Sequence, residues 1–175
     1  MIILITGASR TGKTLLAQKF LEKYHFPYLC IDHLKMGLIR AKFTALTPLD
    51  DDELTPWLWS VVKEIIKTAV ENNQNLIVEG CYVPPFWRKD FSKEYLKNIK
   101  FICLVMSDEF INSHFDEIKK HSLDIEMRLE NECDIKDLKA DNQKFMREFK
   151  KHGEKITLIE NNYEKTINWI LNLDI

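Results

Sequence analysis

The chain has 175 residues, of which 45% are hydrophobic and 30% are charged. These values are typical of a globular protein of about one domain, and they exclude a disordered or collagen-like chain. Lys and Arg number 25 against 27 Asp and Glu, so the formal net charge of −2 gives no overall positive excess for nucleic-acid binding.

The apolar runs and the cysteines indicate the compartment. The longest apolar runs, such as residues 1–5, are far shorter than the roughly 20 residues of a membrane-spanning helix. No basic flank of a secretory signal precedes them. The four cysteines form no Cys-x-x-Cys pair, which favours buried, reduced thiols over metal or disulfide roles. We therefore predict a cytoplasmic protein with no membrane or nucleic-acid partner.

Short apolar runs alternate with longer amphipathic stretches along the chain. The runs are nearly continuous in apolar residues, which is typical of strands buried on both faces of a parallel sheet. The predicted strands are 2–6, 28–31, 76–79, 101–106 and 155–159. The predicted helices are 13–24, 56–72, about 107–120, 137–151 and about 162–173.

Capping residues support several of these helices. Thr55 is expected to cap the helix from Pro56, and Ser107 or Asp108 the one that follows the fourth strand. Asn161 is expected to cap the last helix. The acidic residues 50–52 read as a solvated loop that leads into a helix.

The alternation of strands and helices predicts an α/β fold of three layers with right-handed crossovers. We expect one domain over residues 1–175. Two stretches break the alternation, at 34–52 and at about 119–141.

Residues 7–14 match the pattern G-x-x-x-x-G-K-[ST] of a phosphate-binding loop, between a predicted strand and a predicted helix. Backbone N–H groups of such a loop wrap a phosphate, and the helix dipole favours the anion. The candidate nucleotide-binding residues are Gly7, Ala8, Ser9, Arg10, Thr11, Gly12, Lys13 and Thr14. Lys13 would neutralise the β- and γ-phosphates and Thr14 would ligate Mg²⁺.

Three places in the chain resemble the small P-loop kinases: the loop at 7–14, Cys-Ile-Asp-His-Leu at 30–34 and Leu-Ile-Val-Glu-Gly at 76–80. This group includes adenylate-type nucleoside monophosphate kinases, shikimate and gluconate kinases, and chloramphenicol phosphotransferase. Zeta-toxin-like and 2-phosphoglycerate kinases, the nearest in motif, also belong to it. The resemblance implies the P-loop NTPase fold, with a five-stranded parallel sheet of order 2-3-1-4-5 and a small helical lid at about 119–141. It also implies ATP and Mg²⁺ as cofactors.

The resemblance places two acidic residues near the reacting groups. Asp32 would lie by the γ-phosphate, as the base that orients the acceptor or as a holder of Mg²⁺-bound water. The alternative is that Asp32 caps a helix. Glu79 would bind the acceptor hydroxyl or Mg²⁺-bound water, and the alternative is a carboxylate that braces a loop.

Arginines are further candidates, since their planar guanidinium suits phosphate oxygens. By resemblance, Arg128 lies in the lid and contacts the transferred phosphate, with Arg147 as the second candidate. Arg40 and Arg88 follow the second and third strands, where an acceptor would bind. A solvated surface role is the alternative for each of them.

Aromatic residues after the third strand are candidates to line the acceptor pocket. They are Tyr82, Phe86 and Trp87. Trp57, at helical spacing, reads as a core residue. The loop at 160–162 would lie by the adenine, as in related kinases.

We therefore predict an ATP-dependent kinase that transfers the γ-phosphoryl group of Mg-ATP to a small-molecule hydroxyl or a phosphometabolite. The phosphate loop lacks the Gly-Lys-Gly-Thr ending of adenylate kinases, and no Phe-Pro-Arg follows residue 80. An adenylate-like nucleoside monophosphate kinase is nevertheless the closest alternative among enzymes. An ATP-binding regulatory module with little catalysis is the alternative from another class.

Overall fold

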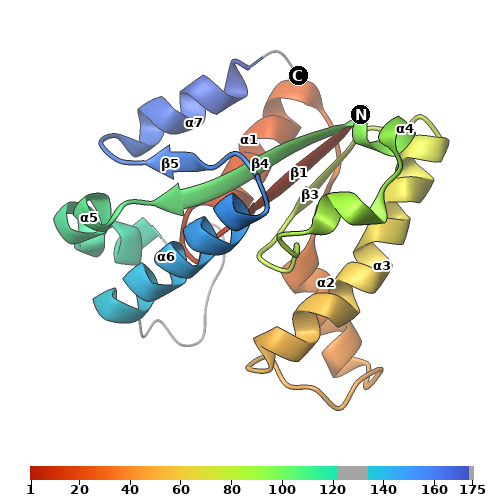
Figure 1. Cartoon of the computed structure of the whole chain (residues 1–175), viewed down its shortest axis with the longest axis horizontal. Coiled ribbons are helices and arrows are strands. Elements are labelled where there is room, and N and C mark those ends of the chain that lie inside the picture. The colour runs from red at the N-terminus through yellow and green to blue at the C-terminus, as the bar shows by residue number, and fades with distance from the viewer. Residues whose placement is uncertain (122–133, 174–175) are drawn as a thin grey trace.

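The computed structural model describes residues 1–121 and 134–173 (Figure 1). Its centre is a five-stranded sheet in which all paired strands are parallel, in the order β2-β3-β1-β4-β5. The strands are β1 (Ile2–Gly7), β2 (Tyr28–Cys30), β3 (Leu76–Glu79), β4 (Ile99–Met106) and β5 (Thr157–Ile159). The predicted fold class, strand order and strand direction are confirmed.

Helices cover both faces of the sheet. They are α1 (Lys13–Tyr24), α2 (Ile31–Arg40), α3 (Asp51–Glu71), the 3₁₀ helix η1 (Trp87–Asp90), α4 (Lys93–Leu96), α5 (Asp108–His121), α6 (Ile135–Lys151) and α7 (Tyr163–Leu171). Helices α1 and α7 pack on one face, while α2, α3, η1 and α6 pack on the other. Figure 1 shows α1 behind the sheet and α6 in front of it. No helix of the described part is both long and apolar enough to cross a membrane.

The central strand β1 joins the two halves of the core. Its side chains alternate between the faces, as in any strand. Ile2 and Leu4 enter the core with α3, whereas Ile3 and Ile5 enter the core with α1 and α7. All six residues of β1 are buried, which explains why the run carries no polar alternation.

Two expectations about the region after β2 are wrong. Residues 31–40 form helix α2, which the prediction missed, and α3 begins at Asp51 rather than at Pro56. The acidic residues after position 50 thus form the first turn of α3, where negative charge stabilises the positive end of the helix dipole. Thr55 is no cap, because its hydroxyl donates to the Asp51 carbonyl at 2.8 Å inside the helix.

The other helix starts are close to those predicted. The Ser107 hydroxyl accepts a hydrogen bond from the Phe110 N–H at 3.1 Å, as expected for the cap of α5. The cap of α7 lies one residue later than predicted, since Asn162 accepts from the Lys165 N–H at 2.7 Å. Most of the predicted lid falls at 122–133 and therefore lies outside the described residues.

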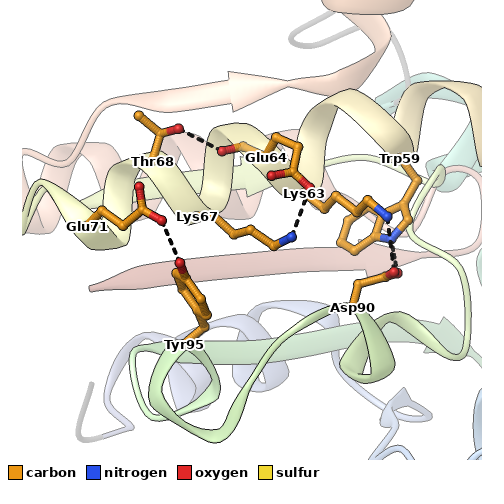
Figure 2. A network of polar contacts seen from close by, with 8 residues as sticks. All are labelled: Trp59, Lys63, Glu64, Lys67, Thr68, Glu71, Asp90 and Tyr95. Atoms are coloured by element: carbon orange, nitrogen blue, oxygen red, sulfur yellow. Dashed lines mark hydrogen bonds and ion pairs between the residues drawn. The ribbon is translucent and has the colours of Figure 1, made fainter.

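Polar contacts fasten the connection between β3 and β4 to α3 (Figure 2). The indole N–H of Trp59 donates to Asp90 at 2.8 Å, and the Lys63 ammonium donates to the same carboxylate at 3.1 Å. Further along α3, Glu64 and Lys67 form an ion pair near the surface. One helical turn later, Glu71 accepts a hydrogen bond from the Tyr95 hydroxyl. These contacts hold η1 and α4 against α3, and with them the loop that follows β3.

The Asp90 carboxylate should contribute stability that depends on pH. Burial raises its pKa, but hydrogen bonds from Trp59 and Lys63 outweigh burial and hold the pKa below its ordinary value of 3.8. A carboxyl whose pKa is depressed by folding stabilises the fold above its unfolded pKa, and this stability is lost as the pH falls through the folded pKa. Asp90→Asn should therefore lower the free energy of unfolding at pH 7 by about 1–2 kcal/mol in urea denaturation.

The matched control is Glu64→Gln, which removes a carboxylate from an exposed pair on the same helix and should cost less than about 0.5 kcal/mol. The difference between Asp90→Asn and the unmodified chain should shrink below about pH 4. A loss that stays constant from pH 7 to pH 3 would show that the charge of Asp90 is not responsible.

Candidate active site

The phosphate loop begins where β1 passes closest to β4. Gly7 has φ +149°, and a Cβ placed on it would lie 2.1 Å from the Leu104 carbonyl oxygen. The N–H of Ala8 donates to that same carbonyl at 3.2 Å. Only glycine allows this approach, so the first glycine of the motif sets the point at which the chain leaves the sheet.

The loop closes at the start of α1. Gly12 has φ +80°, and a Cβ there would lie 1.8 Å from the Tyr163 hydroxyl oxygen. The Thr11 hydroxyl donates to the Ala8 carbonyl at 2.8 Å, and the Lys13 ammonium donates to the same oxygen at 2.8 Å. The lysine thus lies across the loop, while the N–H groups at the beginning of α1 form an anion-binding helix end.

Thr14 and Glu79 face each other at the floor of the site. The Thr14 hydroxyl lies 3.4 Å from both carboxylate oxygens of Glu79, which is 1% exposed at the end of β3. A hydroxyl and a carboxylate are the hard oxygen ligands that Mg²⁺ prefers, and the remaining positions are usually filled by water and phosphate. The pair therefore fits Mg²⁺ bound with ATP. No cluster of three or more His, Cys, Asp or Glu side chains among the described residues forms a metal site by itself.

Cys30 is the neighbour of Glu79 on the adjacent strand. The two residues are partners in the register of β2 and β3. Burial, the charge of Glu79 and a hydrogen bond to its carboxylate raise the pKa of the Cys30 thiol. This thiol stays protonated at neutral pH, so it donates to Glu79 rather than acting as a nucleophile.

A cluster of polar side chains lies beyond the ends of β2 and β3. The Lys35 ammonium pairs with Asp32 Oδ1 at 3.2 Å and donates to the Tyr82 hydroxyl at 2.6 Å. The Tyr82 hydroxyl in turn donates to Asp51 Oδ1 at 2.8 Å. We call these four residues the polar cluster. It joins α2, the loop after β3 and the first turn of α3.

Thr14 of the phosphate loop contacts Glu79, whose partner in the register of β2 and β3 is Cys30, two residues before Asp32 of the polar cluster. The half-buried Cys81 lies in the same loop as Tyr82. Burial raises the pKa of its thiol to about 12, Lys13 lowers it, and Asp32 and Asp51 raise it further. Both the phosphate-loop lysine and two carboxylates of the polar cluster thus act on this thiol.

Asp32 is not the cap of a helix. Helix α2 begins at Ile31, and Cys30 occupies the position of its N-cap. Asp32 is the second residue of the helix, with its side chain 38% exposed. The alternative that Asp32 serves as a cap is therefore wrong, and its carboxylate pairs with Lys35 within the polar cluster instead.

The predicted arginines do not gather at this site within the described residues. Arg40 is exposed at the last position of α2, about 12 Å along the helix axis from Asp32. Arg88 makes two hydrogen bonds with Glu154, at 2.6 and 2.9 Å, and stacks on the ring of Trp87. The first arginine lies at the surface, and the second has a structural partner.

Of the two arginines predicted for the lid, Arg147 and Arg128, only Arg147 lies within the described residues, and among them it makes no contact with the site. Arg147 is exposed on α6 and pairs with its neighbour Glu148 at 3.3 Å. Arg128 lies outside the described residues.

The three candidate aromatic residues after β3 have different fates. Tyr82 reaches the polar cluster, as its contacts show. Trp87 is fully buried and stacks on Phe101, so the expectation that it lines an acceptor pocket is wrong. Phe86 is half-exposed. The sequence shows that Trp87 follows the third strand, but it does not show that packing buries the side chain in the core.

Sequence reasoning missed the contact between α6 and the phosphate loop. The Ser9 N–H donates to Asp141 at 2.7 Å, and the Met106 N–H at the end of β4 donates to the buried Asn142 at 2.8 Å. Gln143 donates to Asp108 at 2.8 Å. Three consecutive residues thus dock α6 over the carboxyl end of the sheet. A local sequence pattern cannot predict such contacts, because the two residues of each pair lie 35 or more positions apart in the chain.

Comparison with known proteins agrees with this architecture. No family model matches the chain. A thermoresistant gluconokinase of Escherichia coli strain K12 is 27% identical over 126 residues, which cover 72% of this chain and 71% of that protein.

Solved structures show the same fold. A deoxyadenosine kinase from M. mycoides has a TM-score of 0.57 at 15% identity, with 98% of this chain and 97% of that chain covered. A shikimate kinase from Bacteroides thetaiotaomicron has a TM-score of 0.55 at 15% identity, with 99% and 97% covered. The resemblance to small P-loop kinases is confirmed, whereas the closer affinity to zeta-toxin-like and 2-phosphoglycerate kinases stays a prediction.

Asp141 should oppose the binding of a polyphosphate, because its carboxylate occupies an N–H of the loop. Two like unit charges 4 Å apart repel by about 1 kcal/mol in water, and the Ser9–Asp141 contact is exposed to solvent. Asp141→Asn keeps an oxygen that accepts from Ser9 and removes the charge. It should tighten ATP binding about threefold to tenfold in isothermal titration calorimetry.

Asp137→Asn is the matched control, since it removes the same charge from an exposed position one turn earlier on α6. It should leave ATP affinity within about twofold, because exposed charges are screened by solvent and salt. Weaker ATP binding by Asp141→Asn would mean that the carboxylate supports the binding conformation of the loop.

Proposed function

We propose that the protein is an ATP-dependent kinase that transfers the γ-phosphoryl group of Mg-ATP to a hydroxyl group of a small molecule. One observation carries this proposal: Thr14 of the phosphate loop contacts Glu79, whose partner on the neighbouring strand, Cys30, lies two residues before Asp32 of the polar cluster. A phosphoryl donor site and a group able to orient a hydroxyl are thus adjacent. The similarity to a gluconokinase supports the same reaction.

ATP would be held by the loop of residues 7–14. Its N–H groups would bind the phosphates, and Lys13 would leave the Ala8 carbonyl to neutralise the β- and γ-phosphates. Thr14 and Glu79 would hold Mg²⁺, which when bound neutralises charge on the transferring group. In phosphoryl transfer most of the catalysis is positioning and electrostatic stabilisation, and these residues serve both.

Asp32 would orient the acceptor. Its carboxylate accepts a hydrogen bond from the acceptor hydroxyl and takes that proton as the oxygen attacks the γ-phosphorus. The bond from this phosphorus to the bridging oxygen of ADP breaks as the new bond forms, so ADP is the leaving group. Arg128 remains our proposal for the lid residue that contacts the transferred phosphate. Arg40 stays a proposal for the rim of the acceptor site, and Arg88 has a structural role through Glu154.

The acceptor is expected to be a small polar molecule rich in hydroxyl groups. The polar cluster offers two carboxylates, one ammonium and one phenol, which suit hydroxyl and carboxylate groups better than an apolar ring. A gluconokinase is the relative at 27% identity, so gluconate is the first acceptor to test. A nucleoside monophosphate acceptor and a regulatory module are not favoured by the relatives. The cytoplasmic location stays a prediction.

A transfer assay tests this function. ATP labelled at the γ-phosphate is offered with gluconate, shikimate, 2-phosphoglycerate, deoxynucleosides and nucleoside monophosphates in separate reactions. The expected result is label in a hydroxy acid or sugar-like acceptor. Label in a monophosphate would favour the alternative enzyme, and tight ATP binding without transfer to any acceptor class would favour the regulatory module.

Lys13→Ala should abolish transfer without disturbing the fold, because within the described residues its ammonium donates to a carbonyl of the loop itself. We expect kcat/KM to fall at least 10³-fold, in line with the loss of a charge clamp on the transferring group. The melting temperature should stay within about 2 °C. Lys19→Ala, on the same helix, is the control and should keep most activity. Unchanged turnover in Lys13→Ala would place the site elsewhere.

Asp32→Asn should lower kcat by about 10²-fold or more, since general-base positioning contributes 10²–10⁴-fold. ATP affinity, measured by calorimetry, should change little because Asp32 belongs to the acceptor side. Asp116→Asn, exposed on α5, is the control for a lost surface charge. A fully active Asp32→Asn enzyme would remove Asp32 from the catalytic step.

A further inference from the structure

We propose that Lys35 is a positioning residue that holds the Asp32 carboxylate in place for the acceptor hydroxyl, with Tyr82 and Asp51 as its support. The inference rests on the proposed function and adds to it a residue that no motif of the chain indicates. It follows from the burial of Lys35, its contacts and the elements that these contacts join.

Lys35 is buried in an unusual way for a lysine. The residue is 8% exposed, whereas lysines rarely lose contact with water unless they are paired. Moving an ammonium group out of water has a large free-energy cost, which must be offset by charged or hydrogen-bonding partners. Lys35 has such partners in Asp32 and Tyr82, and its ammonium also lies 4.9 Å from the centre of the Tyr82 ring. These contacts fix the ammonium at one point.

Tyr82 connects Lys35 to α3 through hydrogen bonds. Its pKa is raised by burial and by the charges of Cys81 and Asp32, so the phenol is neutral and has a proton to donate. That proton goes to Asp51, in the first turn of α3. The ammonium of Lys35 is therefore held by a residue that is 2% exposed and is itself anchored to a third element.

Asp32 gains a defined geometry from this arrangement. It lies in the first turn of α2, and its half-exposed side chain would otherwise sample several rotamers. Lys35 follows three positions later on the same helical face and binds Oδ1. The carboxylate has a second oxygen with which to accept a hydroxyl hydrogen bond. Fixing a reacting group in advance lowers the entropic cost of reaching the transition state.

A lysine that contacts the acceptor itself is the competing explanation. Such a residue would contribute mainly to acceptor affinity, and its loss would raise KM for the acceptor. A residue that orients Asp32 acts on the reacting arrangement, so its loss lowers kcat. A brace of the fold would instead lower the melting temperature and leave kinetic constants of the folded fraction unchanged.

The test is a double-mutant cycle between Lys35→Met and Asp32→Asn, with gluconate or, if the labelled-ATP screen identifies another, the best acceptor found there. Lys35→Met should lower kcat about 10- to 100-fold and change KM for the acceptor less than about threefold. Added to Asp32→Asn, it should lower kcat less than about threefold further, because the residue it positions no longer acts. Tyr82→Phe should give a smaller loss of kcat, of about threefold to tenfold.

Lys35→Arg is the variant that keeps the charge, and it should restore at least part of kcat. Melting temperatures and ATP affinities of all variants show whether each one is folded and binds ATP. Full additivity with Asp32→Asn, a large rise in KM at constant kcat, or unchanged kinetics would each overturn the positioning role. If Asp32→Asn lowers kcat while Lys35→Met does not, the proposed function stands and this inference alone fails. If the unmodified chain transfers phosphate to no acceptor, both fail.

Discussion

The close approach of Gly7 to the Leu104 carbonyl is the constraint on which the site depends. It brings β1 and β4 together at the point where the chain leaves the sheet, and it starts the phosphate loop there. Because β1 is the middle strand of five, the loop rises between the two halves of the sheet. Ligands of open parallel sheets bind at such a point, beyond the carboxyl ends of the strands. The ends of β2 and β3 then supply Asp32 and Glu79 from the adjoining side.

The charged groups around this point are paired with other groups of the protein. Lys13 donates to a loop carbonyl, Lys35 is paired with Asp32, and Asp141 accepts from the loop. Glu79 sits against a hydroxyl and a protonated thiol. In the kinase that we propose, a bound phosphate, metal ion or acceptor hydroxyl would replace these partners.

Structural ties outside the site hold the polar cluster in place. The contacts of α3 with Asp90 and Tyr95 fasten the β3–β4 connection, and Arg88 fastens the same connection to Glu154 near β5. Asp51 then links the start of α3 to Tyr82. The polar cluster is thus carried by elements that are fixed at several points. Solved structures of a gluconokinase, a shikimate kinase and a deoxyadenosine kinase share the fold, and in our proposal side chains such as these select the acceptor.

The sequence by itself determined the parallel sheet, the phosphate loop and helix α1, because continuous apolar runs, two glycines and a lysine are local signals. It also indicated Asp32 and Glu79, since both follow strands whose ends must meet. Only the tertiary structure decided the contacts of Lys35 and Asp141, and the burial of Trp87. The partners of these residues come from distant parts of the chain, and whether a lysine is solvated or buried is decided by packing rather than by its neighbours in sequence. Local periodicity indicates which residues enter the core. The pairing of buried charges depends on how the helices pack against the sheet.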